Sequence, residues 1–245
     1  MRRAAGVAWL LLASAPAETL AKEPAFGITP RRPVAELRLE ALSASPPREA
    51  GPFRPVDLVE LTSLDPTLWL DVRYATSDNF LSTPVYEEAR AFLQRPAAEA
   101  LVRAHRSLKG SGHGLLIHDA YRPWWVTKLF WEATPVDKRA FVADPAKGSR
   151  HNRGCAVDLT LYRLSDGRAV EMPSLYDEMT GRASPGYSGG PPEPRRLRDL
   201  LRSAMEREGF TVYETEWWHF DYRGWRDYPI LNLSFAEVGR RAPSP

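Results

Sequence analysis

The hydrophobic and polar residues from position 56 onward follow patterns typical of alternating strands and helices. Apolar residues at helical spacing predict helices over 97–108 and 124–132. An Asp-Gly turn at 166–167 predicts a hairpin that returns the chain along the preceding strand. Alternating or continuous apolar runs predict the strands themselves, at 67–74, 114–119 and 156–163.

The C-terminal third adds a charged helix and the segment richest in strand-forming residues. Residues 180–194 are rich in Gly and Pro and predict a loop, and a helix is expected over 195–208, capped by Gly209. Thr, Val, Tyr, Trp and Phe crowd residues 210–222, which predicts one strand. Mixed strands and helices joined by a tight hairpin favour a single α+β domain, with an antiparallel sheet flanked by helices, over a doubly wound fold.

The first 55 residues lack the alternating strand and helix patterns of the rest of the chain. Arg2 and Arg3, an apolar run over 4–13 and an Ala-Pro-Ala exit predict a secretory signal peptide at 1–17, with a short buried helix as the alternative. We therefore expect an exported, periplasmic protein. No later apolar segment approaches eighteen residues, so no embedded membrane segment is expected in the mature chain.

A proline-rich segment separates this start from the patterned region. Seven prolines lie between 18 and 55, with little periodicity, and predict a flexible arm. The 190 residues of 56–245 are then one domain's worth of chain.

Charge and cysteine content exclude several classes of protein. The chain has 33 basic and 31 acidic residues, and loss of Arg2 and Arg3 with the signal peptide leaves the mature chain neutral. Neutrality argues against a nucleic-acid partner held by phosphate contacts. A single cysteine, Cys155, excludes an intrachain disulfide and a CxxC metal site. The absence of glycine-rich phosphate loops from the sequence argues against a nucleotide cofactor.

Candidate metal ligands occur in two short segments. His151 and Asp158 are seven residues apart, and His219 ends the sequence Glu-Trp-Trp-His. Two imidazoles and one carboxylate are a common ligand set for catalytic zinc, with the fourth position open for water. Residues seven apart point to opposite faces of an unbroken strand, so residues 152–154 must bend. The other histidines, at 105, 113 and 118, are interpreted as structural.

Two further residues complete a hydrolytic site. Glu216 is three residues before His219, so a local bend must bring the two together; its carboxylate would then be a base for water. Arg122 would be a fixed cation for the oxyanion. Each has a simpler alternative, a solvated carboxylate and a surface arginine in a salt bridge.

Several motifs occur in a definite order between Val56 and about Tyr228. They are D-V-R-Y-A-T-S-D-N-F at 71–80, D-A-Y-R-P at 119–123, S-x-H-x-x-G-x-A-x-D at 149–158, the helix and its exit at 195–210, and E-W-W-H at 216–219. Together they resemble the zinc D-alanyl-D-alanine dipeptidases associated with vancomycin resistance. The sequence departs from the family pattern at Cys155, where a small residue such as serine suits the motif; we expect this thiol to pack as a small hydrophobe.

The resemblance implies a hedgehog/DD-peptidase type fold and one Zn²⁺ per chain, with Glu216 as catalytic base and Arg122 as oxyanion stabiliser. It also implies that Ser149 and Asp177 hold the free amino end of a small D-dipeptide. The metal ligands that it implies are His151, Asp158 and His219.

Zinc-dependent hydrolysis of D-alanyl-D-alanine, in cell-wall turnover, scavenging or glycopeptide resistance, is the function that this resemblance implies. Two alternatives stay open: a peptidoglycan D,D- or L,D-carboxypeptidase on the same scaffold, and a non-catalytic zinc module that binds wall peptides. The sequence leaves the oligomeric state undetermined.

Overall fold

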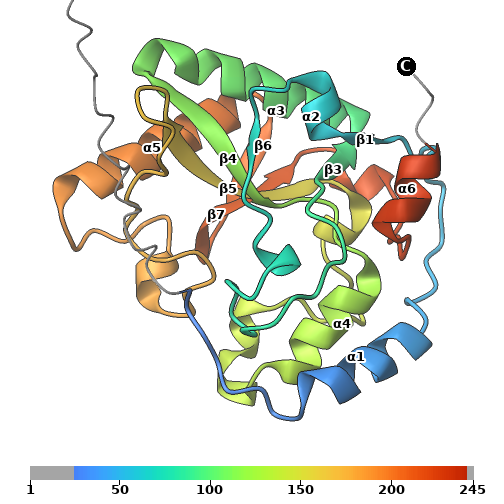
Figure 1. The fold of residues 1–245 in the computed structure, drawn as a ribbon. Coiled ribbons are helices and arrows are strands. Elements are labelled where there is room, and N and C mark those ends of the chain that lie inside the picture. Colours follow the sequence, from blue (N-terminus) through green and yellow to red (C-terminus); the bar gives the residue numbers. More distant parts are fainter. Residues whose placement is uncertain (1–24, 242–245) are drawn as a thin grey trace, which may run out of the picture.

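A computed structural model describes residues 25–241 (Figure 1). The helices are α1 (Val34–Ser43), α2 (Leu61–Leu64), α3 (Arg95–Ser107), α4 (Trp124–Ala133), α5 (Pro192–Arg207) and α6 (Phe235–Arg241). The strands are β1 (Leu58–Glu60), β2 (Trp69–Leu70), β3 (Phe92–Gln94), β4 (His113–Asp119), β5 (Ala156–Arg163), β6 (Phe210–Tyr213) and β7 (Glu216–Tyr222).

A five-stranded sheet forms the centre of the molecule, in the order β2-β4-β5-β7-β6. All neighbouring pairs are antiparallel except β2 with β4 at one edge. Helices α3 and α5 pack against the sheet and against each other, whereas α4 and α1 lie at the opposite side of the molecule (Figure 1). The expected α+β fold, with a largely antiparallel sheet flanked by helices, is confirmed.

The register of the three central strands positions the site. Asp119 on β4 is paired with Asp158 on β5, and Asp158 is paired with His219 on β7. A bulge between Ile117 and Asp119 shifts the end of β4 relative to β5. Because bulges re-aim side chains, this irregularity brings a third polar residue level with the predicted ligand pair.

Two strand predictions were wrong in extent. The strand expected over 67–74 is only Trp69–Leu70, and a 3₁₀ turn follows at Arg73–Ala75. Ion pairs join Arg73 in this turn to Asp71, just before the turn, and to Asp78 in the following loop. Residues 210–222 form two strands rather than one, because the chain turns back at 214–215 and pairs Phe210 with Tyr222.

The prediction of a flexible arm over 18–55 is wrong for residues 34–43, which form the helix α1. Leu37 and Ala41, one helical turn apart, are buried where α1 packs on α4. Only these two positions of the helix are fully buried, and Val34 packs on the core while partly exposed, so the apolar repeat is short. The signal peptide expected at 1–17 and the start of the arm lie outside the described residues. Within 25–241, no helix is both long and apolar enough to span a bilayer.

We expect Leu37→Ala to lower the free energy of unfolding by about 2 to 4 kcal/mol, because it leaves a cavity between α1 and α4. Leu39 lies on the same helix with 71% of its surface exposed, which makes Leu39→Ala a matched control. That control should change stability by less than about 0.5 kcal/mol. Urea unfolding of both variants measures the difference, and equal stabilities would contradict the packing of α1 on the domain.

Candidate active site

A tight turn and a strand pair bring the three predicted ligands together. The 3₁₀ turn His151–Arg153 is followed by Gly154, and β5 starts two residues after that glycine. Gly154 has a φ of 66°, and a Cβ there would lie 2.4 Å from Leu58 Cδ2. Glycine therefore permits the bend that the spacing of His151 and Asp158 requires. His219 then faces Asp158 across the β5–β7 pair.

The ligand atoms form a small triangle. His151 Nε2 lies 3.1 Å from His219 Nδ1, and Asp158 Oδ1 lies 3.3 Å and 3.0 Å from these two nitrogens. All three side chains are buried. Ligands about 2.0 to 2.1 Å from a tetrahedral zinc are separated by about 3.3 Å, so this triangle matches one face of a tetrahedral site.

Hydrogen bonds on the far side of each imidazole fix its tautomer. His151 Nδ1 donates to the carbonyl oxygen of Ala120 at 2.6 Å, and His219 Nε2 donates to Asp221 Oδ1 at 3.0 Å. The nitrogens that face each other therefore both carry lone pairs. Asp158 Oδ1, which faces them, is buried and accepts no hydrogen bond from the described residues. Three converging donor atoms of this kind fit a bound cation.

The second oxygen of Asp158 is held by a residue that the sequence analysis did not identify. Tyr176 donates its hydroxyl to Asp158 Oδ2 at 3.0 Å, and Arg122 Nη2 lies 3.6 Å from the same oxygen. The Tyr176 ring packs against His118 and Trp218. This contact orients the carboxylate so that Oδ1 faces the imidazoles.

Two supporting carboxylates were also missed, although the sequence contained a signal for each. Asp221 is two residues after His219, and such residues share one face of a strand. Asp119 is three residues before Arg122, and its Oδ2 accepts from Nε and Nη2 of that arginine, both at 2.8 Å. Arg122 therefore carries a charge that is paired on one side and directed into the pocket on the other.

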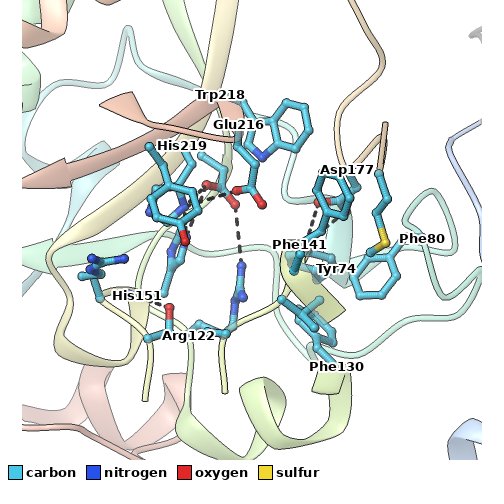
Figure 2. Close-up of a pocket in the computed structure, with 18 of the residues that line it drawn as sticks. Tyr74, Phe80, Arg122, Phe130, Phe141, His151, Asp177, Glu216, Trp218 and His219 are labelled. Carbon is cyan, nitrogen blue, oxygen red and sulfur yellow. Dashed lines mark hydrogen bonds and ion pairs between the residues drawn. The ribbon is translucent and has the colours of Figure 1, made fainter. Parts of the chain in front are cut away.

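Arg122 and Glu216 lie between the ligands and the far end of the pocket (Figure 2). The Arg122 guanidinium packs over the rings of Tyr74 and Phe130, with its carbon 5.3 Å and 4.9 Å from their centres. Glu216 Oε2 is 3.8 Å from His219 Nδ1, because an irregularity between β6 and β7 pairs Glu216 with Tyr213. This irregularity is the bend that the spacing required.

The ionisation of Glu216 suits proton transfer. Burial raises the pKa of this carboxyl to about 7, and nearby His219 opposes the shift. A carboxyl that titrates near neutral pH accepts a proton and gives it up with little difference in free energy. The position of Glu216 beside the ligand triangle and its pKa therefore both suit a general base.

A half-buried acid lies at the opposite end of the pocket from the two histidines (Figure 2). Asp177 accepts hydrogen bonds from the Tyr74 hydroxyl, 3.0 Å from each carboxylate oxygen. Its φ of 62° is unusual for a residue other than glycine, and the turn holds it facing the pocket. Burial, with the charge of Asp158, raises the pKa of Asp177 well above its usual range. A cationic ligand group would stabilise its charged form.

Ser149 lies in the pocket, whereas Cys155 lies outside the ligand cluster. Ser149 lines the pocket and accepts a hydrogen bond from the backbone N–H of His151 at 3.2 Å, so its role toward a substrate stays a prediction. Cys155 is fully buried outside the ligand cluster, and burial raises the pKa of its thiol to about 12. His105 is also buried, with Nδ1 accepting from the N–H of Leu115, as a structural histidine.

A ligand triangle next to a carboxyl that titrates near neutral pH is the arrangement of a metallopeptidase. Residues 54–237 match the Peptidase M15 family model, described as D-ala-D-ala dipeptidase. The chain belongs to this family, as the motifs indicated.

Relatives in several bacteria support the assignment. The chain is 36% identical to the D-alanyl-D-alanine dipeptidase of Escherichia coli over 180 residues, covering 74% of this chain and 92% of the relative. It is 37% identical to the enzyme of that name in Enterococcus faecium, covering 67% and 89%. A solved structure of the LdcB LD-carboxypeptidase aligns with a TM-score of 0.40 and 18% identity, over 79% of this chain and 81% of that one.

We expect Tyr176→Phe to weaken zinc affinity of the metal-free protein by about tenfold, because Asp158 loses the hydroxyl that orients it while the ring contacts remain. Tyr162→Phe is the control, since its hydroxyl donates to the carbonyl oxygen of Thr67. Competition with a chromophoric chelator measures both affinities. Equal affinities in the two variants would show that Tyr176 does not position the ligand.

Proposed function

We propose that this chain is a zinc dipeptidase that releases D-alanine from D-alanyl-D-alanine, with one Zn²⁺ held by His151, Asp158 and His219. The observation that carries the proposal is the buried triangle of lone pairs, whose nitrogen and oxygen donors suit zinc. Three protein ligands leave one position of a tetrahedral ion for water or substrate.

The chain's own residues supply the proton transfer and the charge stabilisation. A bound zinc ion would polarise the scissile carbonyl and increase the acidity of water. Glu216 accepts the proton of the attacking water and passes it to the leaving amine. Arg122, fixed by Asp119, donates to the carbonyl oxygen as negative charge develops there. Asp177 and Ser149 hold the ammonium group of the substrate.

The acid at Asp177 favours a dipeptidase over a D,D- or L,D-carboxypeptidase. A longer peptide carries an acylated nitrogen where the dipeptide carries an ammonium group, and this neutral nitrogen could not form the charge-assisted contact that stabilises the ionised form of Asp177. The carboxypeptidase is therefore the second candidate. A non-catalytic module that binds wall peptides would need neither the base at Glu216 nor the cation at Arg122.

We further propose that the protein is exported to the periplasm and meets dipeptides released there, in cell-wall turnover, scavenging or glycopeptide resistance. The basic, apolar and small-residue segments of residues 1–17 support this location. Fractionation and N-terminal sequencing of the protein from cells test it. A cytoplasmic protein that retains Met1 would contradict export.

We expect purified protein to release D-alanine from D-alanyl-D-alanine, and to lose this activity with a chelator and regain it with zinc. An N-acetylated D-alanyl-D-alanine is the comparison substrate, and it should be cleaved at least about tenfold more slowly because it lacks the ammonium group. Amino-acid analysis measures both rates. Preference for the acylated substrate would favour the carboxypeptidase, and no cleavage of either would favour the binding module.

Glu216→Gln should lower kcat at least about a hundredfold while zinc remains bound, because the amide keeps the shape of the side chain but cannot accept the proton. Glu214→Gln is the matched control, since Glu214 lies exposed in the turn between β6 and β7. Steady-state kinetics and metal analysis measure the two effects. Unchanged kcat in Glu216→Gln would refute its role as the base.

A further inference from the structure

Two arginines line the pocket, and only one of them forms a short hydrogen-bonded ion pair with an acid. Arg122 is buried and directs Nε and Nη2 to Asp119, so an internal acid compensates its charge. Arg150 immediately precedes His151, and 36% of its side chain is exposed. No hydrogen bond from the Arg150 guanidinium occurs within residues 25–241. Its nearest acid is Asp221, whose Oδ2 lies 3.5 Å from Nε.

Aromatic rings hold the Arg150 guanidinium in place. Its central carbon lies 5.4 Å from the centre of the Tyr213 ring and 5.0 Å from that of Trp225. Such contacts restrict the side chain without using its N–H groups. The planar guanidinium is therefore preorganised, and its remaining donors are available for a carboxylate.

Arg150 lies on the side of the ligand triangle that is opposite to Asp177. Tyr213 packs on the His219 ring with centres 5.3 Å apart, and Asp221 accepts from His219 Nε2. Both groups contact Arg150, so its guanidinium adjoins the His219 side. Asp177 lies across the pocket, beyond Glu216 and Arg122 (Figure 2).

The two charges of a free dipeptide match the order of Asp177 and Arg150 across the pocket. Its ammonium group precedes the scissile bond, and its carboxylate follows that bond by one residue. With the ammonium group at Asp177 and the scissile carbonyl between Arg122 and the ligand triangle, the carboxylate reaches toward the His219 side. Of the two pocket arginines, Arg150 is the one whose charge is not already paired by a short hydrogen bond.

We propose that Arg150 binds the C-terminal carboxylate of the dipeptide and so selects substrates that end one residue after the scissile bond. This inference rests on the proposed dipeptidase function and adds the recognition of the second end of the substrate. Arg150 and Asp177 would then bind the two charged ends of the dipeptide, and only a substrate of that length would contact both.

Kinetics with D-alanyl-D-alanine and its C-terminal amide test the inference, because the amide lacks only the negative charge. In the wild-type protein, kcat/KM should be at least about tenfold higher for the free dipeptide. Arg150→Gln should lose most of this preference by raising KM for the free dipeptide, with less than about threefold change for the amide. Arg226→Gln is the control, since the exposed Arg226 also packs on Trp225, 4.2 Å from its ring centre, but does not line the pocket.

Metal analysis of each variant separates substrate recognition from an indirect effect through Asp221 and His219. Equal zinc content, with the preference lost only in Arg150→Gln, supports the inference. An unchanged preference, or an equal loss on both substrates, overturns it while the dipeptidase function stands. If the wild-type protein cleaves neither substrate, the proposed function fails and the inference fails with it.

Discussion

The structure depends on three lone pairs that face one another across 3.0 to 3.3 Å in the interior of the domain. Buried donor atoms that converge at this separation form the ligand set of a cation. The protein fixes this arrangement from outside: Ala120 and Asp221 set the two imidazole tautomers, and Tyr176 holds the far oxygen of Asp158. Loss of any of these contacts would let a ligand rotate away, so the supporting residues matter nearly as much as the ligands.

The register of the sheet provides this precision. Three neighbouring strands place Asp119, Asp158 and His219 at paired positions of the sheet. Irregular pairing in β4 and between β6 and β7 redirects side chains that a regular strand would point elsewhere. The same arrangement orders the charges across the pocket, from Asp177 past Arg122 to the His219 side. Groups at the strand ends and Asp177 in its loop thus face one pocket.

The segment before the family match is part of the domain. Residues 25–53 precede the matched region of 54–237, yet α1 packs on α4, which carries the pocket residue Phe130. Farther along, the carboxylate of Glu49 accepts from the guanidinium of Arg153, which lies in the turn between two of the predicted ligands, and from the N–H of Ile230. The segment therefore braces both the pocket wall and the ligand turn from outside.

The sequence by itself determined the α+β class, the helices α3, α4 and α5, the strands β4 and β5, and the candidate metal and catalytic residues, because hydrophobic periodicity and short motifs are local properties. It did not determine the helix within the proline-rich segment, the turn that divides residues 210–222, or the contacts of Tyr176 and Asp221. Leu37 and Ala41 of α1 are buried only because α1 packs on α4. Tyr176 reaches Asp158 only because the loop that carries it folds back onto β5. The tertiary structure decided these features, since they depend on groups that are distant in the chain and whose proximity no local pattern records.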